Sequence, residues 1–123
     1  MVTTIVHRLF EAARLMPWMP PIWIREIVSE GGTLRERMLR HFPARAMSAV
    51  TEHIAREQAT GLVPAGIDPR LTFLSIAGTV MLPLAARPLW RRLPGLADVT
   101  DADLERHALT LLTAGLVPAR RRS

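Results

Sequence analysis

The sequence predicts an all-α domain of about six helices, and three features support this prediction. Proline or glycine separates segments whose apolar residues recur every three or four positions, the spacing of one helix face. No segment alternates apolar and polar residues over enough positions to predict a strand. The uncharged run 71–86 is too short to span a membrane, since a helix of this length covers about 24 Å. We expect one domain over residues 1–117 and a disordered basic tail over 118–123.

Three of the expected helices lie in the first half of the chain, over 3–16, 22–30 and 34–42. Thr3 or Thr4 is placed to cap the first helix. The segment PWMPP at 17–21 ends that helix and opens the second, because proline disfavours helix at the preceding residue and suits a first helical turn.

The other three are expected over 44–61, 69–87 and 101–116. Asp68 and Pro69 read as the cap and first residue of the uncharged helix. Thr100 and Asp103 have the spacing of a capping box at the start of the last helix. The segment between these two helices, 87–100, is expected to be a loop or a broken helical turn.

The composition excludes several kinds of site. The chain has no cysteine, so disulfides, thiolate nucleophiles and cysteine metal sites are excluded. The net charge of +5 includes three arginines of the tail 120–122, so the rest is not a basic nucleic-acid-binding domain. His53 and Glu57 lie one helical turn apart, but one pair does not make a metal site. We therefore predict no enzyme activity, no cofactor and no metal site.

Three segments taken together resemble one known family. They are PWMPPIWIREIVSEGG at 17–32, REQATGLVPAGIDPRL at 56–71 and, after the uncharged helix, DLERHALTLLTAGL at 103–116. In this order they resemble the C-terminal regulatory domain of TetR-family transcriptional repressors. The resemblance covers residues 2 to 117.

The resemblance implies a cytoplasmic, all-helical homodimer that binds a small effector. In that family the last two long helices of each subunit form an intersubunit four-helix bundle, which here implies 69–87 and 101–116. The predicted interface residues are Leu74, Gly78, Met81, Leu104, Ala108, Leu111 and Gly115. DNA binding in the family belongs to a preceding helix-turn-helix domain, so none is assigned here. Residues 1–16 resemble the far half of the helix that joins the two domains, which favours either a fragment of a longer repressor or a stand-alone effector domain.

The predicted ligand is a small apolar or amphipathic effector. Trp18 and Trp23 flank the PWMPP break, and broken backbone beside large rings and flexible methionines is typical of adaptable pockets. The predicted ligand-binding residues are Phe10, Met16, Trp18, Trp23, Met38, Met47, Val50 and Phe73. The alternative is that these side chains fill the core, in which case the chain is a ligand-free helical module that pairs with a partner regulator.

Overall fold

The computed structural model describes residues 1–28, 36 and 44–116. Its helices are α1 (Val2–Leu15), α2 (Met19–Val28), α4 (Ala44–Ala59), α5 (Pro69–Ala85), α6 (Arg87–Trp90) and α7 (Asp101–Gly115). No strand occurs in the described residues, so the expected all-α fold is confirmed. The helix expected over 34–42 lies, apart from Glu36, outside the described residues.

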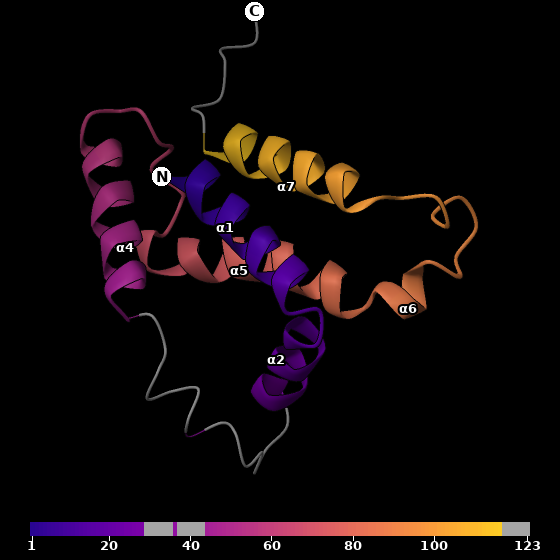
Figure 1. Ribbon diagram of the computed structural model, residues 1–123. Coiled ribbons are helices and arrows are strands. Elements are labelled where there is room, and N and C mark those ends of the chain that lie inside the picture. The colour runs from indigo at the N-terminus through magenta and orange to yellow at the C-terminus, as the bar shows by residue number, and fades with distance from the viewer. Residues whose placement is uncertain (29–35, 37–43, 117–123) are drawn as a thin grey trace, which may run out of the picture.

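Helix α5 is the centre of the fold and contacts α1, α2, α4, α6 and α7. In Figure 1 it runs across the middle of the molecule, with α4 at one end, α6 at the other and α7 alongside. Ile76 and Val80 on its inner side are 0% exposed. The core cluster consists of Val6, Phe10, Ala13, Val50, Ile54, Val63, Phe73, Ile76, Ala77, Val80, Leu84 and Ala108. Burying a charge there without a partner is costly, so this side of α5 is apolar.

The predicted starts of α5 and α7 are confirmed. The Asp68 carboxylate accepts a hydrogen bond from the Arg70 backbone N–H at 2.9 Å, and Pro69 is the first residue of α5. Before α7, the Thr100 hydroxyl accepts from the Asp103 backbone N–H at 3.1 Å. The Asp103 carboxylate accepts in return from the Thr100 backbone N–H at 3.0 Å, which completes the capping box.

Two predicted helix starts are wrong. Met1 is the N-cap of α1 without a side-chain hydrogen bond, so Thr3 and Thr4 lie inside the helix and do not cap it. Helix α2 begins at Met19, earlier than expected. Its first turn contains Pro20 and Pro21, and their missing N–H groups are not needed there because the first turn has no intrahelical acceptors for them.

The connection between α5 and α7 contains the short helix α6 and is held at two points. The Trp90 indole N–H donates to the Pro83 carbonyl at 2.7 Å. Arg87 forms an ion pair with Asp101, the first residue of α7. Helix α5 continues through Pro83 to Ala85, and the Trp90 backbone N–H donates to the Ala86 carbonyl at 3.2 Å. Helix α6 therefore follows α5 with little interruption.

Candidate functional site

The outer face of α5 is apolar but exposed. Leu74 is 50% and Leu82 54% exposed, and the one charged residue of the helix, Arg70, lies in its first turn. Gly78 lies between the two leucines, and a Cβ built on it meets no heavy atom of the described residues within 4 Å. At about 100° per residue these positions share one stripe. The outer stripe is formed by Leu71, Leu74, Gly78 and Leu82.

Helix α7 extends this apolar surface beside the first half of α5. Leu111 is exposed, as are Ala114 and Gly115 near the end of the helix. Exposed leucines on two helices in contact form a contiguous apolar surface. Surfaces of this kind mark interaction sites in soluble proteins.

An open groove lies where the end of α7 meets the start of α5. Its volume is about 330 Å³. The groove is lined by Gly66, Ile67, Asp68, Leu71, Thr72, Ser75, Ile76, Leu111, Leu112, Gly115 and Leu116. Leu71 and Leu111 belong both to the groove and to the exposed apolar surface, so the two features are continuous.

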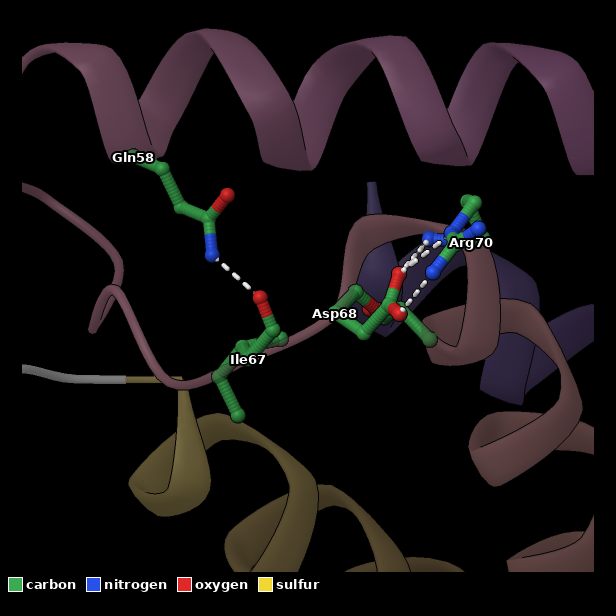
Figure 2. Close-up of polar contacts among 5 residues, drawn as sticks. Gln58, Ile67, Asp68 and Arg70 are labelled. Carbon is green, nitrogen blue, oxygen red and sulfur yellow. Dashed lines mark hydrogen bonds and ion pairs between the residues drawn. The ribbon is translucent and has the colours of Figure 1, made fainter.

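A glutamine holds the loop on one side of the groove. Figure 2 shows the Gln58 side-chain amide, from α4, pointing to the carbonyl oxygen of Ile67. The same amide nitrogen donates to the Pro64 carbonyl at 3.0 Å. Gly61, which has a φ of +78°, supplies the left-handed residue after α4. The loop therefore follows a path fixed by its hydrogen bonds to α4.

Asp68 and Arg70 form the polar edge beside the groove. Arg70 Nη2 lies 2.7 Å from Asp68 Oδ2, and Arg70 Nε donates to Asp68 Oδ1 at 3.1 Å, as Figure 2 shows. The hydrogen bond from the Arg70 side chain lowers the pKa of Asp68 below its usual value. At pH 7 the negative charge of Asp68 and the positive charge of Arg70 cancel, so the groove has no net charge at this edge.

The predicted ligand-binding residues that the structure describes divide between the core and the surface. Phe10, Val50 and Phe73 are part of the core cluster, and Trp23 and Met47 pack against it. Trp18 is 60% exposed and Met16 is exposed as well. Met38 lies outside the described residues. A surface cavity of about 300 Å³ between α1 and α4 includes Val50 in its lining, together with Met1, Thr4, Ile5, Ala46 and Ala49.

The predicted interface residues divide between the surface and the core. Leu74, Gly78, Leu111 and Gly115 are exposed. Leu104 is partly buried against the core. Met81 and Ala108 are each 2% exposed and pack inside the monomer. The surface that a partner can reach is thus the exposed group, extended by Leu71 and Leu82.

A feature that the sequence reasoning missed is the apolar tip formed by α6 and the turn after it, residues 89–96. Leu89, Leu93 and Leu96 are all exposed, and Leu89 is exposed the most of these at 72%. Leu89 lies two helical turns after Leu82, so the spacing of the outer stripe continues into α6. The seven-residue spacing from Leu82 to Leu89 is the sequence pattern that could have predicted this exposed tip.

Among residues 1–28, 36 and 44–116, no group of three or more histidine, aspartate or glutamate side chains is placed to hold a metal ion. In the same part of the chain, no helix has both the length and the apolar character needed to cross a membrane.

Comparison with known proteins leaves the geometry as the basis for assigning function. No protein-family model matches this sequence, and no curated protein is significantly similar to it.

Proposed function

We propose that this chain is the helical regulatory domain of a TetR-like transcriptional regulator and that it forms a homodimer through α5 and α7. The observation that carries the proposal is the outer stripe of α5, in which exposed leucines flank a glycine. Leaving several leucines in water is unfavourable by about 1.5–3 kcal/mol for each side chain that would otherwise be fully buried. A second copy removes that cost, and Gly78 permits close approach of the two backbones.

The regulatory part of the proposal rests on the contacts of α1. Helix α1 packs against both α5 and α7, and the His7 imidazole Nδ1 contacts the Glu105 carboxylate of α7. A change in the tilt of α1 therefore changes its contacts with both helices of the proposed interface. A small apolar or amphipathic effector that prefers one tilt would shift the population toward it.

A second candidate function is a ligand-free pairing module. The observation in its favour is that Phe10, Val50 and Phe73 are all buried in the core cluster together with their neighbours. Titration with a panel of lipophilic compounds separates the two candidates. An effector-binding domain shows a raised melting temperature and a change in tryptophan fluorescence with at least one compound, whereas a ligand-free module shows neither.

The dimer is tested by placing a charge in the proposed interface. Gly78→Arg and Leu111→Glu each put an unpaired charge where it loses its water on pairing, which costs several kcal/mol. Light scattering is expected to show a dimer for the unmodified chain and a monomer for both variants. Leu15→Glu is the matched control, because Leu15 is exposed at the end of α1 and belongs to neither helix of the proposed interface. A variant that stays dimeric with unchanged melting contradicts this interface.

A further inference from the structure

The groove and the apolar tip lie at opposite ends of α5. Figure 1 shows the end of α7 close to the start of α5, and α6 beyond the other end of α5. The groove is a hollow of about 330 Å³, whereas the tip presents leucines outward. The groove and the tip of one molecule lie too far apart to meet each other. A second copy in the opposite orientation brings its tip to the groove of the first.

The sequence positions allow that arrangement. In a symmetric dimer, a two-fold axis at right angles to α5 through Gly78 pairs residues that lie equally far on either side of it. Leu74 then meets Leu82 of the second copy, which places the exposed leucines of the stripe against each other. Counted along the chain, Leu89 in α6 lies as far after Gly78 as Ile67, in the loop before α5, lies before it. Ile67 lines the groove, so pairing about Gly78 brings the tip end of one copy to the groove end of the other.

The interface area also requires more than α5. A helix of 17 residues is about 25 Å long, and a strip about 10 Å wide along it covers roughly 250 Å² in projection. Stable complexes bury about 800 Å² on each partner. The contact therefore has to extend beyond α5, and the leucine tip and the groove supply apolar surface at its two ends.

The parallel arrangement of the two α5 helices is disfavoured. It brings the two tips together, and each tip carries Arg91 and Arg92, both exposed, so like charges approach each other. It also sets groove against groove and leaves both hollow. The antiparallel arrangement separates the arginines of the two copies and fills both grooves.

We propose that the two α5 helices pair antiparallel about Gly78, so that the α6 tip of each copy inserts Leu89 into the groove of the other. This inference rests on the proposed dimer and names the contact that closes it. The groove is then completed by the second copy. Pairing in this way covers Leu71 and Leu111, the exposed rim residues of the groove.

Cysteine cross-linking tests the arrangement, because the chain has no cysteine of its own. One chain carries Gly66→Cys and a size tag, and the other carries Leu89→Cys. Gly66 accepts a side chain, since a Cβ there meets no heavy atom of the described residues within 4 Å. After the two chains are mixed and treated with a short bismaleimide, the tagged–untagged product is expected to dominate. Leu15→Cys, equally exposed on α1, replaces Leu89→Cys as the control and is expected to give no such product.

Each outcome decides between the alternatives. Cross-links between identical Leu89→Cys chains indicate parallel pairing and overturn the inference. A chain that scatters as a dimer but gives no cross-link between positions 66 and 89 overturns the inference and leaves the proposed dimer standing. A chain that scatters as a monomer overturns both.

A second measurement quantifies the contact. Leu89→Ser is expected to raise the dimer dissociation constant at least about 10-fold, because both copies in the dimer lose the buried Leu89 side chain. Leu15→Ser serves as the matched control and is expected to leave the constant unchanged. Equal effects of the two substitutions contradict the insertion of Leu89.

Discussion

The two sides of α5 have the same apolar character but different surroundings. The inner side places Ile76 and Val80 in the core cluster with residues of α1 and α4, and both side chains are fully buried. The outer side leaves Leu74 and Leu82 half exposed. Arg70 in the first turn is the single charged residue of α5, and the rest of both sides is uncharged, although only the inner side is covered within the monomer. Under the proposed dimer, the outer side keeps its leucines for a second copy, while the inner side keeps its own for folding.

The largest expected effect separates the two sides directly. Ile76→Ala is expected to lower the free energy of unfolding by about 2–5 kcal/mol, because it removes buried methyl groups and leaves a cavity. Leu82→Ala is expected to cost about 0.5 kcal/mol or less in the monomer and to weaken dimerisation instead. Urea unfolding at low protein concentration, paired with light scattering at high concentration, checks both. Equal losses of monomer stability would remove the distinction between the sides.

The second prediction concerns the loop that lines the groove beside the outer side. Gln58→Ala removes the hydrogen bonds from one side-chain amide to the carbonyls of Pro64 and Ile67. The expected loss is about 1–2 kcal/mol of unfolding free energy. Hydrogen exchange of the Ile67 amide, which donates to the Pro64 carbonyl at 3.2 Å, should become faster. Glu52→Ala, at an exposed position of the same helix, is the control, and an equal effect there contradicts a specific role for Gln58.

Local chemistry made the helix starts around α5 and α7 predictable. The Asp68 cap and the Thr100–Asp103 capping box depend on residues only two or three positions apart, so their spacing is sufficient to identify them. The predicted cap of α1 was wrong, because Thr3 and Thr4 have side chains that suit a helix cap but do not serve as one here. The helix begins before them, at Val2, so the identity of these two residues does not determine where the helix starts.

Which side of α5 faces the core was not predictable in the same way. Beyond Arg70 in its first turn, the helix has no charged residue on any side. Charge therefore does not identify the side that faces solvent. Met81 was placed in the predicted interface, yet it lies at the edge of the inner side and is buried in the monomer. The direction of its side chain depends on how the neighbouring helices pack, and the spacing of residues within α5 does not predict that packing.

The predicted ligand cluster shows the same limit. The PWMPP break correctly predicted a helix boundary, because proline acts on its own backbone and on its neighbour. It did not predict the direction of the rings, and Trp18 points to solvent while Trp23 packs against the core. The proposal that this cluster binds an effector stays a prediction.

The third prediction concerns the position of α7, whose end forms the other wall of the groove. Thr100→Ala removes one half of the capping box and is expected to cost about 1 kcal/mol of unfolding free energy. Thr110→Ala is the matched control, because the Thr110 hydroxyl is exposed and only donates to the Arg106 carbonyl one turn earlier. Thermal unfolding of both variants checks the difference. A cost that is equal for the two threonines contradicts the capping role of Thr100.

The smallest expected effect concerns the pair at the start of α5. Asp68→Asn keeps a side chain that caps a helix well and removes only the charge, so its effect is expected to be smaller than that of Thr100→Ala. The hydrogen bond from Arg70 lowers the pKa of Asp68 below the usual 3.8, so the charged form stabilises the folded state. That contribution is present above about pH 3.8 and is lost as the pH falls through the lower pKa of the folded state. Melting curves of the variant and the unmodified chain are therefore expected to differ at pH 7 and to converge in acid.

Because Arg70 is exposed, salt screens the pair, and the difference at pH 7 should shrink in high salt. A difference that persists at pH 2 would show that the asparagine caps α5 poorly, and that the cap, not the ion pair, holds the helix start beside the groove.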